Sequence, residues 1–288
     1  MDRQEKWEKL LKTKEDYQAA NRQDNPEQNG VVSQVREMEF LRDGKKIYGR
    51  LHLPLDTSPI DRYPLVILCH GLGADMSETE PYAEKFAAHG IAGFAFDFIG
   101  GGPEIRSDGE MTEMSVLTEA ADLQVVIDQL SRQPLIDKHH IFLMGQSQGG
   151  YVATHVAAES IHADNMIRGL IACYPAYGLE KDAMRRSEQA GEIPEQEQIF
   201  DCTIGRIYTE DALKMDIYDE MRCYPGEVLL MHGTDDVLVP IAGSEEALAC
   251  FPHASLIPVE GAGHGFFDAD EEFCAEQVIR FVREHKWD

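Results

Sequence analysis

The stretch Ile141-Phe-Leu-Met-Gly-Gln-Ser-Gln-Gly-Gly150 decides the fold of this chain. An apolar run, typical of a buried strand, leads into a serine flanked by glycines. The next residues, 151–158, are mostly apolar and predict a buried helix. A strand, a sharp turn and a helix in this order are the context in which a G-x-S-x-G sequence presents a nucleophile, so Ser147 is the candidate nucleophile.

The glycine spacing has a steric reason. A serine on such a turn has a strained backbone, and only small neighbours fit beside it. Gly145 and Gly149 stand two residues on either side of Ser147, where a Cβ would collide with the facing strand or helix. The helix that follows would direct its N-terminal N–H groups and the positive end of its dipole toward charge that develops near Ser147.

Composition limits the classes of function. The 288 residues include 52 Asp plus Glu against 26 Lys plus Arg, a formal charge of -26 that argues against nucleic acid and anionic membrane partners. The six cysteines form no C-x-x-C pair, which favours free thiols in a reducing compartment. The first residues lack the apolar core of a signal peptide, and no stretch approaches the ~18 consecutive apolar residues of a membrane span. We therefore expect a cytoplasmic protein.

Strands alternate with helices along most of the chain. Two strands, 35–41 and 47–53, flank an Asp-Gly pair that predicts an antiparallel hairpin. Apolar runs then predict strands at 65–69, 91–96, 141–146, 167–173, 227–231 and 254–259, with helices at 77–89, 111–130 and 271–284. This alternation predicts an α/β fold with a mostly parallel, doubly wound sheet.

Two segments depart from that alternation. Residues 1–32 are charged, partly helical in pattern and end in a linker-like stretch, so we expect an N-terminal extension to a main domain of residues 33–288. Residues 175–226 are polar with scattered aromatics and are much longer than the dozen or so residues of a crossover connection. We interpret them as a cap inserted over the active site.

A serine nucleophile needs a base, and the base needs a carboxylate that orients it. His264, in the loop Gly261-Ala-Gly-His-Gly-Phe266 after the last predicted strand, is the candidate base. The segment His232-Gly-Thr-Asp-Asp-Val-Leu-Val-Pro240 supplies two candidate carboxylates. A D-x-x-V-P arrangement favours Asp236, and Asp235 is then expected to be a turn or capping residue.

An oxyanion intermediate needs backbone N–H donors. One is expected from Gln148, directly after the nucleophile, and the other from Leu72 in the loop His70-Gly-Leu-Gly73. Since the backbone amide would donate, the Leu72 side chain is free to line an acyl pocket. His70 is expected to brace this loop.

These four segments together resemble the α/β-hydrolase superfamily over about residues 35–286. The S-Q-G-G sequence at the elbow, Asp97 with Gly100-Gly-Gly102, and the long insertion look most like bacterial cinnamoyl and feruloyl esterases. That resemblance implies Ser147, Asp236 and His264 as a catalytic triad and Leu72 and Gln148 as the oxyanion hole. It also implies hydrolysis of hydroxycinnamoyl esters. The chain departs from those esterases at Leu72, where an aromatic residue is common, and in its N-terminal extension.

The sequence thus predicts a serine carboxylic-ester hydrolase that acts on small esters without metal or cofactor. A monoacylglycerol lipase or thioesterase, or a serine aminopeptidase, would use the same residues, and acidic side chains of the insertion would then anchor a charged terminus. A non-catalytic ligand-binding relative is the alternative of another class. The sequence leaves open whether the chain forms a homodimer.

Overall fold

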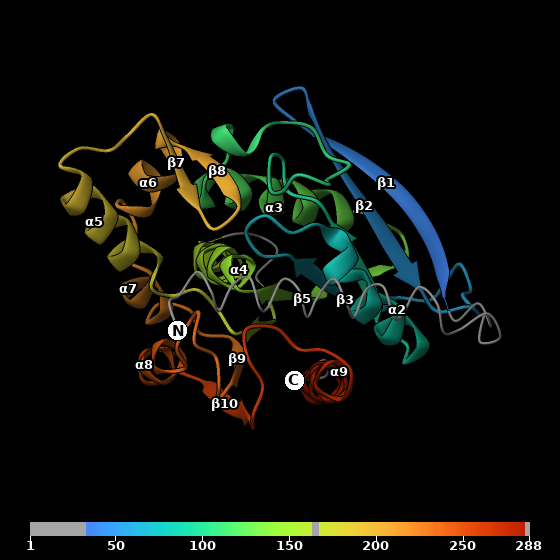
Figure 1. Cartoon of the computed structure of the whole chain (residues 1–288). Coiled ribbons are helices and arrows are strands. Elements are labelled where there is room, and N and C mark those ends of the chain that lie inside the picture. The colour runs from blue at the N-terminus through green and yellow to red at the C-terminus, as the bar shows by residue number, and fades with distance from the viewer. Residues whose placement is uncertain (1–32, 163–166, 286–288) are drawn as a thin grey trace.

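The computed structural model describes residues 33–162 and 167–285 (Figure 1). Its main sheet has eight strands in the order β1-β2-β4-β3-β5-β6-β9-β10. The strands are β1 (Gln34–Arg42), β2 (Lys45–Leu53), β3 (Tyr63–Cys69), β4 (Ala92–Phe96), β5 (Ile136–Gln146), β6 (Gly169–Cys173), β9 (Glu227–Gly233) and β10 (Ala254–Val259). β2 pairs antiparallel with β1 and with β4, and all other neighbours are parallel. The predicted mostly parallel α/β sheet is confirmed.

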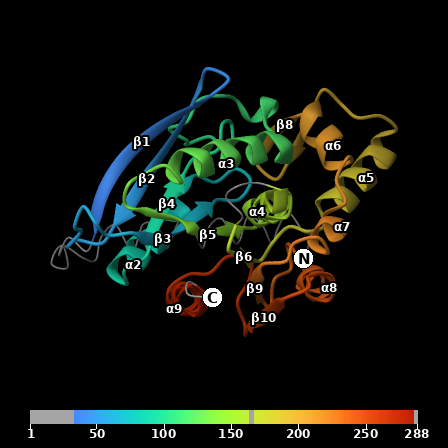
Figure 2. The same cartoon turned by 180° about the vertical axis from the view of Figure 1, so that it is seen from behind.

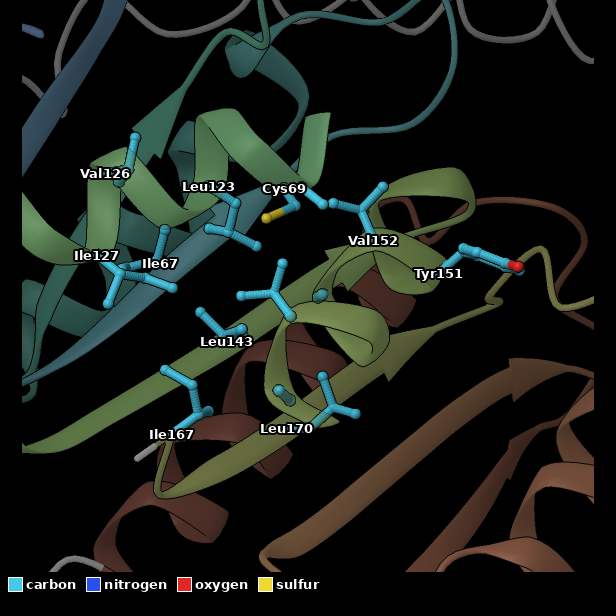
Figure 3. Close-up of a cluster of buried hydrophobic side chains, with 14 of the residues drawn as sticks. Ile67, Cys69, Leu123, Val126, Ile127, Leu143, Tyr151, Val152, Ile167 and Leu170 are labelled. Atoms are coloured by element: carbon cyan, nitrogen blue, oxygen red, sulfur yellow. The ribbon is translucent and has the colours of Figure 1, made fainter. Parts of the chain in front are cut away.

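The sheet is buried on both faces because alternate side chains of each central strand enter different cores. In β3, Leu65 and Ile67 belong to one hydrophobic cluster, whereas Val66 and Leu68 belong to the other. Helices α3 (Val116–Leu130), α4 (Gln148–Glu159) and α8 (Ala242–Cys250) cover the first core, and α2 (Glu80–Ala88) and α9 (Ala269–His285) cover the second (Figures 1 and 2). Figure 3 shows side chains of β3, β5 and β6 packed against those of α3 and α4.

The predicted hairpin at the edge of the sheet is confirmed. Asp43 and Gly44 both have positive φ, 52° and 82°, as a two-residue turn that matches the twist of its strands requires. The predicted helix over 111–130 is not continuous. A short 3-10 turn (Met111–Glu113) is followed by extended backbone at Met114. Ser115 then starts α3 with a reciprocal capping box to Thr118, which satisfies the first N–H groups of a new helix.

The segment between β6 and β9, residues 175–226, is called the insertion below. It contains α5 (Leu179–Ala190), a hairpin of β7 (Gln196–Ile199) and β8 (Cys202–Gly205), α6 (Arg206–Ala212) and α7 (Ile217–Met221). In both overall views it lies beside α3 and α4 (Figures 1 and 2). Three of its tyrosines, Tyr177, Tyr208 and Tyr224, are fully buried, so a segment that is polar in sequence is anchored by aromatic side chains.

The predicted N-terminal extension, residues 1–32, lies outside the described residues. Within residues 33–162 and 167–285, none of the helices is both long enough and apolar enough to cross a lipid bilayer.

Candidate active site

Ser147 lies on the turn between β5 and α4, with φ 51° and ψ -118°. A serine rarely adopts this backbone conformation, which glycine tolerates, so the position stores strain. A Cβ at Gly145 would lie 2.2 Å from the Gly149 carbonyl oxygen, and one at Gly149 would lie 2.3 Å from that of Cys69. Both glycines are therefore required for the start of α4 to pack against the ends of β3 and β5.

The loop after β3 lies against the nucleophile, since a Cβ at Gly71 would be 3.3 Å from the Ser147 Cβ. His70 holds this loop in place. Its Nε2 accepts from the Phe98 N–H at 3.2 Å, so the proton is on Nδ1, which donates to the Gly71 carbonyl oxygen at 2.9 Å. His70 is thus a neutral, buried brace.

Two backbone amides are the predicted oxyanion donors. Gln148 is the first residue of α4, and Leu72 follows Gly71. In the part of the chain that the structure describes, neither N–H donates to another backbone group. The dipole of the twelve-residue helix α4 favours negative charge at its N-terminus, where Gln148 lies.

Three side chains from distant parts of the chain form one hydrogen-bonded series. His264 Nε2 lies 2.9 Å from the Ser147 Oγ, and His264 Nδ1 lies 2.7 Å from the Asp236 Oδ2. The ring of Tyr174 packs edge-on against the imidazole, with centroids 5.0 Å apart, and against Phe266 at 4.9 Å. These aromatic contacts restrict the orientation of the imidazole between the hydroxyl and the carboxylate.

The Asp236 carboxylate is buried but has four donors. Its Oδ1 accepts from the backbone N–H groups of Leu238 and Val239 at 2.9 and 2.8 Å. Its Oδ2 faces His264 and, at 3.2 Å, the Nε2 of His232. Burial by itself would raise the pKa of Asp236, but the hydrogen bonds from His232 and His264 outweigh it and lower the pKa to about 2. The carboxylate is therefore ionised at neutral pH.

The neighbouring aspartate lies elsewhere. Asp235 is exposed, and its backbone N–H donates to the Ala262 carbonyl oxygen at 3.0 Å, which ties together the two loops that carry Asp236 and His264. The structure thus brings Asp236, and not Asp235, to the imidazole.

His232 has a place in the site that sequence reasoning did not assign. Its Nε2–H is shared between the Val239 carbonyl oxygen at 2.8 Å and the Asp236 Oδ2 at 3.2 Å, and its Nδ1 lies 2.8 Å from the Ser244 Oγ. The ring is completely buried and fixes the loop that carries Asp236. Its position at the end of a strand, four residues before an aspartate, was the available signal.

The insertion reaches the loop after β3. A Cβ at Gly73 would lie 2.4 Å from the Cys202 Sγ on β8, and Met111 lies close to the same position. Leu72, Met111 and Cys202 are half-buried. They give the surroundings of this loop an apolar character. Among the described residues, no group of three or more His, Cys, Asp or Glu side chains is arranged to hold a metal ion.

Known proteins share this architecture. A family model described as serine aminopeptidase, S33, matches residues 62–200, and one described as TAP-like protein matches residues 216–287. The structure of Est1E from Butyrivibrio proteoclasticus with ferulic acid bound matches with a TM-score of 0.78 at 24% identity, over 87% of this chain and 100% of that one. The chain has the α/β-hydrolase fold.

Curated relatives match shorter stretches. An Escherichia coli "Uncharacterized 31.7 kDa protein in traX-finO intergenic region" is 34% identical over 99 residues, which is 34% of each chain. The "Putative esterase NocK" of Nocardia uniformis subsp. tsuyamanensis is 32% identical over 99 residues, 33% of this chain and 29% of that protein. The chain thus spans about a third of the length of these relatives.

Backbone strain at Ser147 is open to a direct test. We expect the free energy of unfolding of Ser147→Gly to be about 1 kcal/mol higher than that of Ser147→Ala. Glycine adopts a positive φ without strain, whereas alanine keeps the strain. Urea unfolding of the two variants measures the difference. Because both variants lack the Ser147 hydroxyl, the loss of its hydrogen bond does not contribute to the difference between them. Equal stability of the two variants would contradict strain at this position.

Proposed function

We propose that the chain is a serine carboxylic-ester hydrolase that works through an acyl-enzyme. The observation that carries this proposal is the series from the Ser147 Oγ through His264 to the buried Asp236, at 2.9 and 2.7 Å. A histidine within hydrogen-bond reach of a serine, itself oriented by a carboxylate, is the arrangement that activates a hydroxyl for attack on a carbonyl carbon.

The proposed reaction has two halves. The Ser147 Oγ bonds to the ester carbonyl carbon while His264 Nε2 takes its proton. The N–H groups of Leu72 and Gln148 stabilise the negative oxygen of the tetrahedral intermediate. The bond to the alcohol then breaks, and His264 returns the proton to the leaving oxygen. Water attacks the acyl-enzyme by the same steps and frees Ser147, while Asp236 stabilises the transient imidazolium.

For the substrate we propose a small ester with an apolar acyl group, of which hydroxycinnamoyl esters are the first candidates. The apolar side chains of Leu72, Met111 and Cys202 near the oxyanion loop support an apolar acyl group. The likeness in fold to Est1E with bound ferulic acid supports the aromatic class. In this proposal the insertion is the cap, because β8 contacts the loop and the Tyr208 hydroxyl donates to the Gln148 side chain at 2.6 Å.

Removal of the nucleophile or the base tests the proposal most directly. We expect Ser147→Ala and His264→Ala each to lower turnover of p-nitrophenyl acetate by ~10⁴-fold or more, because neither variant can form the activated alkoxide. A fluorophosphonate probe should label the unaltered chain and not Ser147→Ala. Labelling that persists in Ser147→Ala, or turnover near the original value in either variant, would refute the assignment.

Asp235 and Asp236 are adjacent, so variants of the two form a matched test of which carboxylate orients His264. Asp236→Asn should lower kcat by roughly 10³-fold or more, because an amide at this position no longer stabilises the imidazolium. Asp235→Asn, an isosteric change at an exposed position, should change kcat by less than about threefold. Steady-state kinetics of the two variants decide the matter, and the reverse pattern would transfer the role to Asp235.

A substrate panel tests the acyl preference separately. We expect methyl ferulate to give a higher kcat/KM than monoglycerides, medium-chain p-nitrophenyl esters or aminoacyl amides, because the proposed pocket suits a flat aromatic acid. The amount of acid formed from each substrate of the panel can be measured by chromatography. A preference for monoglycerides would favour a lipase, and cleavage of aminoacyl amides would favour an aminopeptidase.

A further inference from the structure

A chain of buried side chains runs from α3 through the elbow to the insertion. The Tyr208 hydroxyl on α6 donates to the Gln148 Oε1 at 2.6 Å. The Gln148 Nε2 donates to the Glu119 Oε2 on α3 at 2.9 Å. All three residues are at most 2% exposed. The Gln148 side chain is thus held by two hydrogen bonds, one from Tyr208 and one to Glu119. The backbone amide of the same residue is a proposed oxyanion donor.

Glu119 lacks the partners that a buried carboxylate needs. Its Oε1 has no hydrogen-bond partner among the described residues, and the cation of this region, Arg42, bonds to Asp122 instead. Burial raises the pKa of Glu119 to about 8. The hydrogen bond from Gln148 lowers this pKa by less than burial raises it, and the nearby Asp122 carboxyl raises it further. Glu119 is therefore protonated and neutral at pH 7.

The buried thiol and phenol near Glu119 do not change charge just above neutral pH, and the other carboxyl groups of this region have partners of their own. Burial raises the pKa of the Cys69 thiol on β3 and of the Tyr208 hydroxyl on α6, so both stay neutral. The Asp122 carboxyl one turn along α3 has a pKa raised by burial to about 6 and is bonded to Arg42. On α6, Asp211 is occupied by the Ser115 hydroxyl and by Lys214.

We propose that Glu119 is a positioning residue for the oxyanion hole, which works only while it is protonated. In this form it holds the Gln148 side chain, together with Tyr208, without placing a charge behind the Gln148 amide. Its ionisation would put an uncompensated negative charge in a buried region, one side chain away from the site where the oxyanion is proposed to form. This inference rests on the proposed function.

The alkaline limb of the pH profile tests this role. For p-nitrophenyl acetate, followed at the isosbestic wavelength of p-nitrophenol and corrected for spontaneous hydrolysis, we expect kcat of the unaltered chain to fall about tenfold or more between pH 7 and pH 10. Glu119→Gln keeps the acceptor for Gln148 and cannot ionise, so its kcat should stay level over this range.

A matched control and a second variant complete the kinetic experiment. Asp122→Asn removes another buried carboxyl of the same helix, which contacts Arg42 and the Ile99 N–H and not Gln148, so the alkaline limb should remain. Tyr208→Phe removes the other bond to Gln148 and should lower kcat with little change in KM. An alkaline limb that persists in Glu119→Gln would overturn the inference and leave ester hydrolysis standing.

Thermal unfolding gives a readout that does not depend on turnover. The folded pKa of Glu119, about 8, lies above its ordinary value of 4.5, so the unaltered chain loses stability as pH rises through this window. The Tm of Glu119→Gln relative to the unaltered chain should therefore increase from pH 5 to pH 8. A constant Tm difference would refute a neutral Glu119. Absence of any ester turnover in the unaltered chain would overturn the proposed function, and the proposed role with it.

Discussion

The strained turn at Ser147 is the constraint on which the rest of the site depends. Its positive φ reverses the chain within one residue and brings the start of α4 against the end of β3. This contact leaves room for no side chain at Gly145 or Gly149. The same reversal places Ser147 at the positive end of helix α4. The strain is tolerated because the turn is attached to the end of β5, a central strand of a sheet that is buried on both faces.

Two buried carboxyl groups flank this turn, and their surroundings give them opposite charge states. Asp236 accepts from two backbone amides and faces two imidazoles, so its pKa falls to about 2 although it is buried. Glu119 accepts one hydrogen bond from an amide side chain, so burial prevails and its pKa rises to about 8. The number and charge of the donors, and not the depth of burial, decide which carboxyl is ionised. A charged group beside His264 and a neutral one behind Gln148 both suit the proposed reaction, in which negative charge forms on an oxygen atom.

The insertion is joined to this chemistry by polar and apolar contacts together. Tyr208 reaches Gln148, and Cys202 lies over the loop after β3. A segment that would otherwise be only a long connection thereby contributes to the shape of the site and to the rigidity of one amide donor. Such a link makes the insertion part of the proposed oxyanion hole as well as part of the proposed acyl pocket.

The sequence by itself determined the order of strands and helices and the types of residue that are candidates for the site. Apolar runs with turn residues at their ends predicted the strands, and the glycine spacing predicted the elbow, because both patterns are local and steric. The break before α3 escaped prediction because the capping box of Ser115 competes with an equally good helical pattern. Only the tertiary structure decided that Asp236 is buried against His264, that His232 supports it, and that Glu119 lies behind Gln148. Two of these contacts join side chains that are 28 and 29 residues apart in the chain, and no local sequence pattern records which residues meet.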